Sequence, residues 1–138
     1  MSKGSEKHQV RISDLNSFGK DLARRCKSHC ELCDNHGVKL TIHEVPPVPK
    51  EPELDHCIFI CEQCNEQITF PKRLGINHWH CLHASIWSEV PAVQVMAVLM
   101  AKRIADKADF AEELLDQIYL EEPIQTWIED AEKELNKK

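Results

Sequence analysis

Apolar residues recur at helical spacing in the first quarter of the chain. Three- and four-residue steps place four of them on one helical face: Leu15, Phe18, Leu22 and Cys26. Ser13 is a suitable N-cap, and Asp14 would follow it in the first turn, where an acidic residue is favoured. The pattern predicts a helix from Ser13 to about Lys27, preceded by a frayed end of about ten residues.

A two-residue period replaces the helical one at Val38. Apolar and polar residues alternate from there to Val45, which is typical of a half-buried strand. The following run, 46–52, holds four prolines and therefore predicts an extended, stiff connection. Because the segment Cys57–Cys61 (Cys-Ile-Phe-Ile-Cys) then reads as a returning strand, the two segments together predict a hairpin.

From Asn77 onward the helical period returns. Asn77 is expected to cap a short helix in which four residues share a buried face: Trp79, Leu82, Ile86 and Trp87. Three further helices are expected over residues 91–107, 109–120 and 123–135. The 91–107 segment is apolar nearly all round, so it is either central to the fold or shared with a second subunit. The second alternative predicts a homodimer formed through this helix.

These elements predict an α+β fold of one domain's size. A small treble-clef or zinc-ribbon hairpin unit (29–76) would pack on a mostly helical C-terminal bundle (77–138), and residues 1–28 would form an N-terminal helix with a basic end. We expect 28–138 to be one compact unit. No apolar stretch is long enough for a bilayer and no secretory apolar segment begins the sequence, so we expect no membrane partner and a cytoplasmic location.

Charge is unevenly distributed along the 138 residues. The net charge is −6, with +3 over residues 1–50, −2 over 51–108 and −7 over 109–138. Basic and acidic ends indicate either two solvated faces or complementarity with a partner. Five cations could serve nucleic-acid binding: Arg24, Arg25, Lys27, Lys72 and Arg73. The acidity of the whole chain disfavours that function, because affinity for phosphates requires cationic patches.

Seven cysteines and eight histidines are the most unusual feature of the composition. An odd cysteine count without an export signal fits a reducing compartment. Four cysteines form two CxxC pairs, separated by 27 residues: Cys30 and Cys33, then Cys61 and Cys64. Two such pairs predict one structural Zn²⁺ in a closed four-sulfur shell, with the second pair opening a helix. A redox CxxC or buried free thiols are the alternatives. The other three, Cys26, Cys57 and Cys81, are expected to be small buried hydrophobic residues.

A second metal site could be built from histidines and a carboxylate. Its candidate residues are His43, Glu44, His56, His80 and His83. A treble clef of this kind resembles that of HNH-type nucleases, in which the first strand carries a metal ligand and a general base. Glu44 takes the place of that base here, and Asn65 stands on the final helix where a histidine is expected. For the histidines that flank Cys81, which are His78, His80 and His83, packing around Trp79 and Trp87 is the structural alternative.

Several sequence blocks together resemble the PhnA family, labelled as alkylphosphonate-utilisation proteins. Besides the two CxxC pairs, the blocks are 44–47 (Glu-Val-Pro-Pro), 54–57 (Leu-Asp-His-Cys), 77–82 (Asn-His-Trp-His-Cys-Leu), 88–96 and 115–122. The resemblance implies a zinc-ribbon-like region, with the four cysteines at its metal site, and a link to phosphonate metabolism. Longer members continue into an SH3-like domain, which we expect this chain to lack.

The closed four-cysteine shell leads us to expect a non-catalytic, zinc-binding accessory or interaction module, which the resemblance links to phosphonate metabolism. Some family members carry the label phosphonoacetate hydrolase, but a closed four-cysteine shell offers neither a nucleophile nor an open metal position for hydrolysis. A nucleic-acid-binding zinc finger is one alternative. A metal-dependent hydrolase or degenerate HNH-type nuclease is the other.

Overall fold

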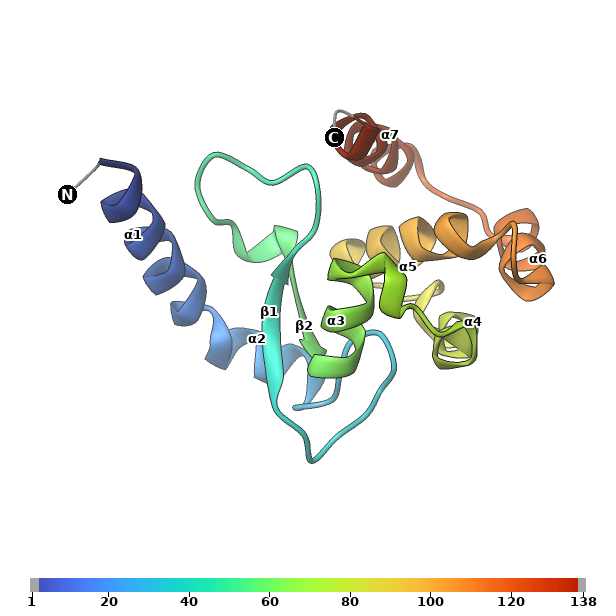
Figure 1. The fold of residues 1–138 in the computed structure, drawn as a ribbon, viewed down its shortest axis with the longest axis horizontal. Coiled ribbons are helices and arrows are strands. Elements are labelled where there is room, and N and C mark those ends of the chain that lie inside the picture. Colours follow the sequence, from blue (N-terminus) through green and yellow to red (C-terminus); the bar gives the residue numbers. More distant parts are fainter. Residues whose placement is uncertain (1–2, 137–138) are drawn as a thin grey trace.

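The structure is an α+β arrangement of helices around one two-stranded antiparallel hairpin (Figure 1). The computed structural model describes residues 3–136. Its α-helices and strands are α1 (Lys3–Ser17), α2 (Gly19–Cys26), β1 (Leu40–Glu44), β2 (Cys57–Cys61), α3 (Glu62–Thr69), α4 (Leu82–Ser85), α5 (Pro91–Ile104), α6 (Asp109–Gln117) and α7 (Glu122–Asn136). Three short 3-10 turns complete them: η1 (Leu54–His56), η2 (Pro71–Arg73) and η3 (Ile76–Cys81).

The hairpin is the element that carries the cysteines. β1 pairs with β2 in a register that sets Leu40 opposite Cys61 and Glu44 opposite Cys57. All of β2 except Phe59 is buried, as expected for an apolar run of five residues that packs against helices. The sequence therefore predicted β2 at its observed bounds, whereas β1 begins two residues later than the alternation suggested.

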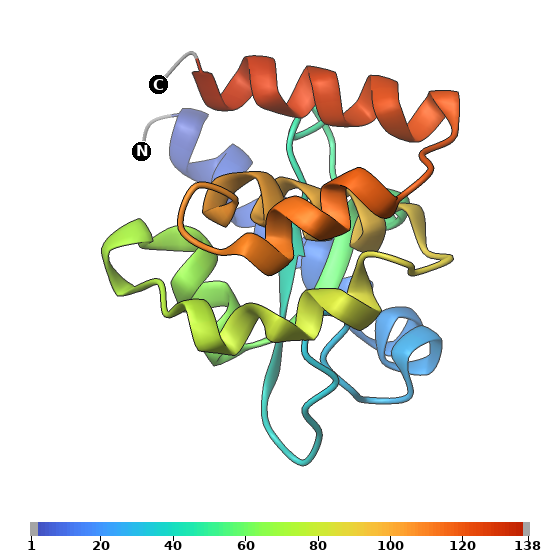
Figure 2. The same ribbon diagram turned by 90° about the vertical axis from the view of Figure 1, so that its right-hand side faces the viewer.

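α5 lies at the centre of the helical part. α4, α6 and α7 pack against it, and α7 runs across the top of the view in Figure 2. Ten of the fourteen residues of α5 are buried within the single chain. The structure thus shows the first of the two alternatives for this apolar helix, a central position. Homodimerisation stays a prediction, but the apolar surface that suggested it is already covered.

Trp79 anchors the turn between the hairpin unit and the helical part. Its side chain is fully buried, and its indole N–H donates to Gln67 Oε1 over 2.8 Å. The amide of Gly75 donates to the same oxygen over 2.9 Å. Gln67, on α3, is itself buried, so this amide oxygen satisfies two donors in the interior.

Two expectations for this region were wrong. Asn77 does not cap a helix, because it lies inside the 3-10 turn η3, which begins at Ile76. Trp87 does not share the buried face, since half of its surface is exposed. The reason is the brevity of α4, which ends at Ser85. A shared helical face requires a continuous helix, and here the backbone changes from η3 to α4 and then turns toward α5.

The N-terminal helix also differs from its prediction. Ser13 is interior to α1, which begins at Lys3, and a separate helix, α2, begins at Gly19. Phe18 divides the two helices, and its amide donates to Leu15 O in a bond that spans only three residues. Glycine at position 19 lowers the helical propensity at this point, while the ten residues expected to fray contain good helix formers and no proline.

Arg11 links α1 to the end of β1 and to the loop that follows it. Arg11 donates through Nε and Nη2 to both carboxylate oxygens of Glu44 at the end of β1. It also donates to the carbonyl oxygens of Pro49 and Lys50 over 3.0 and 2.9 Å. The Glu44 carboxylate raises the pKa of Arg11, as expected for a charge-assisted pair. Two segments far apart in the sequence are therefore joined through one guanidinium group.

We expect Arg11→Ala to release α1 without disturbing the rest of the fold. Several hydrogen bonds to a charged group are lost, so amide exchange in α1 should accelerate about tenfold or more. Hydrogen exchange read by mass spectrometry measures this directly. Arg24→Ala is the matched control, because the Arg24 side chain is 80% exposed and its pairing with Asp21, at 4.0 Å, is long and weak. Unchanged exchange over residues 3–17 of the Arg11 variant would contradict the assignment.

Among the described residues, no helix has the length and apolar character needed to cross a membrane.

Candidate metal centre

Four cysteine sulfurs from two distant parts of the chain meet at the end of the hairpin. Cys30 and Cys33 lie in the loop after α2, Cys61 is the last residue of β2, and Cys64 lies in the first turn of α3. Their Sγ atoms all lie within 4.8 Å of one another. The predicted grouping of the two CxxC pairs is therefore what the structure has, and the group could hold a metal ion.

The spacing of the sulfurs fits a tetrahedral ion. Cys30 Sγ is 3.7 Å from Cys64 Sγ, and Cys33 Sγ is 3.6 Å from Cys61 Sγ. A zinc tetrahedron with Zn–S bonds of about 2.3 Å has S–S edges of about 3.8 Å. A disulfide would require about 2.05 Å, and all four cysteines are free thiols. The donor set therefore suits zinc in both chemistry and size.

The two CxxC loops place their sulfurs by the same local contact. The amide of Cys33 donates to Cys30 Sγ, and the amide of Cys64 donates to Cys61 Sγ, each over 3.5 Å. In the second loop Cys61 is also the N-cap of α3, so the helix dipole adds to the stabilisation of its thiolate. The first loop ends at Asp34, whose positive φ of 65° turns the chain back toward β1.

The thiols of this group titrate as a set. The hydrogen bond between the Cys30 and Cys64 sulfurs lowers the pKa of Cys30 to about 4. The same bond, together with burial, raises the pKa of Cys64, while burial raises that of Cys33 to about 12. One sulfur is therefore a ready thiolate, and an incoming cation must displace protons from others. Metal affinity should consequently fall as the pH falls.

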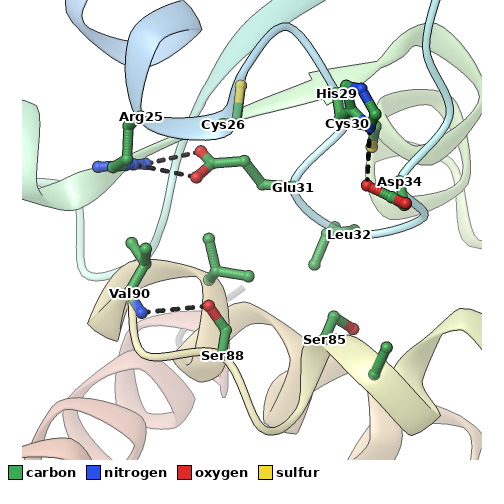
Figure 3. Close-up of a pocket in the computed structure, with 12 residues that line it drawn as sticks. Arg25, Cys26, His29, Cys30, Glu31, Leu32, Asp34, Ser85, Ser88 and Val90 are labelled. Carbon is green, nitrogen blue, oxygen red and sulfur yellow. Dashed lines mark hydrogen bonds and ion pairs between the residues drawn. The ribbon is translucent and has the colours of Figure 1, made fainter.

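Glu31 joins the first CxxC loop to the hairpin, as Figure 3 shows for its contact with Arg25. Arg25 donates to both of its carboxylate oxygens, over 3.0 and 2.6 Å, and to Cys57 O over 2.9 Å. The amide of Phe59 donates to Glu31 Oε1 over 2.8 Å. Only 5% of the Glu31 side chain is exposed. Sequence reasoning missed this contact, because it treated Arg25 only as part of the basic end of the N-terminal helix and as a candidate for nucleic-acid binding.

His78 covers the sulfur of Cys64. Its Nε2 lies 3.1 Å from Cys64 Sγ, and its ring meets that of Trp79 edge-on at 5.2 Å. Burial lowers the pKa of His78, which favours the neutral ring, and the tautomer with its proton on Nε2 would donate to the Cys64 sulfur. A hydrogen bond to a metal-bound thiolate spreads its negative charge and orients the ligand. The sequence signal was the cluster of histidines around Cys81, within which nothing distinguished His78.

We expect His78→Ala to lower zinc affinity about tenfold or more, since outer-shell partners commonly contribute that much. Competition with a chromogenic chelator gives the affinity. His83→Ala is the matched control, because that side chain is exposed and its Nδ1 contacts only the backbone oxygen of His80. Equal affinities of the two variants would show that the His78 contact contributes nothing to metal binding.

The candidate residues of the second site lie in separate surroundings. The Glu44 carboxylate is bound by Arg11. His43 is half-buried on β1, and desolvation of its ring lowers its pKa, an effect that the neighbouring Asn65 side chain opposes. Within residues 3–136, the four cysteines are the only group of three or more His, Cys, Asp or Glu residues whose ligand atoms are close enough to bind one metal ion. No three of the five candidates are thus brought together.

The remaining candidate histidines stack on aromatic rings. The His56 ring lies 4.5 Å from that of Trp127. His80 and His83 lie 4.1 and 5.3 Å from Phe110 and are nearly parallel to it. Of the three histidines expected to pack around Trp79 and Trp87, His78 contacts Trp79. His80 and His83 pack on Phe110 instead.

The cations considered for nucleic-acid binding are partly neutralised. Arg25 is bound by Glu31, and Arg73 pairs with Glu66 and lies 4.7 Å above the Phe70 ring. Arg24 and Lys27 are exposed at the end of α2, whereas Lys72 lies on η2. The five therefore come from two different elements and offer fewer free charges than the sequence suggested.

A shallow pocket of about 370 Å³ lies between the first CxxC loop and the α4–α5 connection (Figure 3). Arg25 and Glu31 line it but are bound to each other. Ser88 Oγ accepts from the amide of Val90 over 3.1 Å, and Ser85 Oγ donates to Cys81 O over 3.3 Å. These four polar groups serve the structure of the wall. The pocket is also lined by Cys26 and by His29, whose Nδ1 lies 3.0 Å from Asp34 Oδ1.

Comparisons of the chain with protein-family models, with curated proteins and with solved structures found no match. The resemblance to the PhnA family therefore rests on the sequence blocks alone.

Proposed function

We propose that this protein is a zinc-stabilised, non-catalytic accessory or interaction module. The observation that carries the proposal is the closed group of four cysteine sulfurs, spaced for one tetrahedral ion. Cys30, Cys33, Cys61 and Cys64 would be the ligands of a single structural Zn²⁺. The ion would join the loop after α2 to the start of α3 and so hold a hairpin too small to be stable by itself.

We assign the metal-binding unit to the treble-clef type. Its order of parts supports this: a CxxC loop, a hairpin, and a second CxxC pair whose first cysteine caps a helix. A zinc ribbon also has two CxxC loops on a hairpin, but it does not require a helix at the second loop. α3, which begins directly after Cys61, favours the treble clef.

The absence of catalysis in this proposal follows from coordination. Four thiolates fill a tetrahedral shell, so no position remains for water or substrate. Outside the shell, the candidate carboxylate Glu44 is held by Arg11, and the candidate histidines pack on aromatic rings or in the interior. A role in phosphonate metabolism, by the resemblance to the PhnA family, belongs to the same proposal as an accessory and not a hydrolytic one.

Cobalt substitution tests the proposal directly. Protein refolded with Co²⁺ should show the intense visible spectrum of a tetrahedral tetrathiolate ion, at one cobalt per chain. Added imidazole or cyanide should leave that spectrum unchanged, because a closed shell has no free position. A spectrum that shifts with either ligand would indicate an open site and favour the hydrolase alternative. Failure to bind metal at all would remove the proposal.

A further inference from the structure

The four sulfurs of the metal centre are unequally covered. Cys30, Cys61 and Cys64 are 2%, 3% and 0% exposed. Cys33 is partly exposed, and it is the only one of the four that solvent reaches to that extent. This difference in exposure does not increase metal affinity, because each thiolate contributes equally to a tetrahedral zinc site.

The asymmetry comes from the two loops that supply the ligands. Cys61 and Cys64 lie between β2 and α3, where packing and the contact with His78 cover them. Cys33 instead precedes residues 34–39, all of which are exposed. The chain turns at Asp34, away from the interior, so this loop leaves one side of the metal centre open to small molecules in solution.

With zinc bound, exposure and a thiolate state would coincide only at Cys33. Cys26 and Cys81 are also partly exposed, but they lie outside the sulfur cluster. Neither sulfur would be a ligand of the proposed ion, so the ion would deprotonate neither of them. A zinc-bound cysteine, in contrast, is deprotonated by the ion. The thiolate, not the thiol, is the nucleophile in cysteine chemistry.

We propose that Cys33 is an alkylation site for soft carbon electrophiles and that its modification releases the zinc ion. The inference rests on the proposed zinc centre. Cys33 Sγ forms a bond to the electrophilic carbon while the bond from that carbon to its leaving group breaks, and the leaving group departs with the electron pair. The product is a neutral thioether, so the ion loses one of its four thiolate ligands. Three thiolates and a water molecule then bind the zinc ion more weakly, so a chelator in solution can remove it.

Iodoacetamide is the probe, used on the full-length, zinc-loaded protein. Labelled positions are read by peptide mass spectrometry, while a chromogenic chelator follows zinc release. We expect Cys33 to be labelled first, with iodide as leaving group, and one zinc to be released per Cys33 modified. First labelling of Cys26 or Cys81, or equal rates at the buried ligands, would overturn the assignment. Labelled Cys33 with zinc still bound would overturn the release step.

A Cys33→His variant separates nucleophilicity from ligation. Histidine supplies a fourth ligand in a Cys₃His shell, so zinc should remain bound while release by iodoacetamide slows about tenfold or more. Cys26→Ser and Cys81→Ser should release zinc at the wild-type rate. If Cys33→His loses its metal on folding, the labelling order in the wild type still decides. Wild-type protein that contains no zinc would refute the metal centre itself, whereas bound zinc with labelling elsewhere refutes only the role of Cys33.

Discussion

Replacing Cys61 or Cys64 with serine should leave the protein without zinc and largely unfolded. Both sulfurs are buried, at 3% and 0% exposure, and both belong to the start of α3. Structural zinc contributes on the order of 10 kcal/mol to small domains. That is comparable to the whole stability of a typical domain, about 5–15 kcal/mol. Loss of the ion should therefore remove the folded state of the hairpin unit.

Metal analysis and thermal unfolding followed by circular dichroism measure the two effects. Cys26→Ser is the matched control, because Cys26 is partly exposed and lies outside the sulfur cluster. That variant should keep one zinc per chain and unfold cooperatively. A strong chelator should lower the unfolding temperature of the wild type in the same direction as the ligand variants, since removal of a ligand that binds only the folded state destabilises it. A Cys61→Ser variant that unfolds like the wild type would refute a structural role for the metal.

The metal group could be predicted from sequence because its information is local. Each CxxC pair places two sulfurs within one tight loop. The apolar run between Cys57 and Cys61 predicts the strand that leads to the second loop. One further requirement, that the two loops meet, follows from the chemistry of a four-coordinate ion. The starts of the C-terminal helices are equally local, since α5 begins at Pro91 and α6 at Asp109 as predicted. Both helices end three residues earlier than predicted, at Ile104 and Gln117.

The contacts that surround the group could not be predicted in this way. His78 reaches Cys64 only because η3 is a 3-10 turn, which the helical period between Asn77 and Trp87 conceals. Arg25 and Glu31 are six residues apart, a spacing with no significance on one helix, and they meet because the loop after α2 folds back. The pairing of Arg11 with Glu44 spans 33 residues. Such contacts depend on tertiary arrangement, and residue periodicity does not encode them.

The Glu31 contact explains how the first CxxC loop keeps its position against β2. The backbone amide of Glu31 donates to Phe59 O, and its carboxylate accepts from the amide of Phe59. Arg25 completes the contact by linking that carboxylate to Cys57 O. The loop is thus fixed by hydrogen bonds to β2 as well as by the metal. Preorganisation of this kind lowers the conformational cost of bringing four sulfurs to one ion.

Glu31→Ala should therefore destabilise the fold by about 3 kcal/mol or more, the cost of removing one partner of a buried ion pair. The variant leaves the Arg25 guanidinium and the Phe59 amide without their main acceptor. Zinc affinity should fall as well, because the loop that carries Cys30 and Cys33 loses its attachment. Urea unfolding of the zinc-loaded protein and chelator competition measure the two quantities.

Glu66→Ala is the matched control, since it removes a carboxylate from an exposed pair. The side chains of Arg73 and Glu66 are 60% and 42% exposed, against 24% and 5% for Arg25 and Glu31. Exposed pairs contribute about 1 kcal/mol or less. The Glu31 variant should therefore lose several times more stability than the Glu66 variant. Glu31→Gln should lie between them, because its amide oxygen can still accept from Phe59. Equal losses for the two alanine variants would mean that the metal alone positions the first CxxC loop.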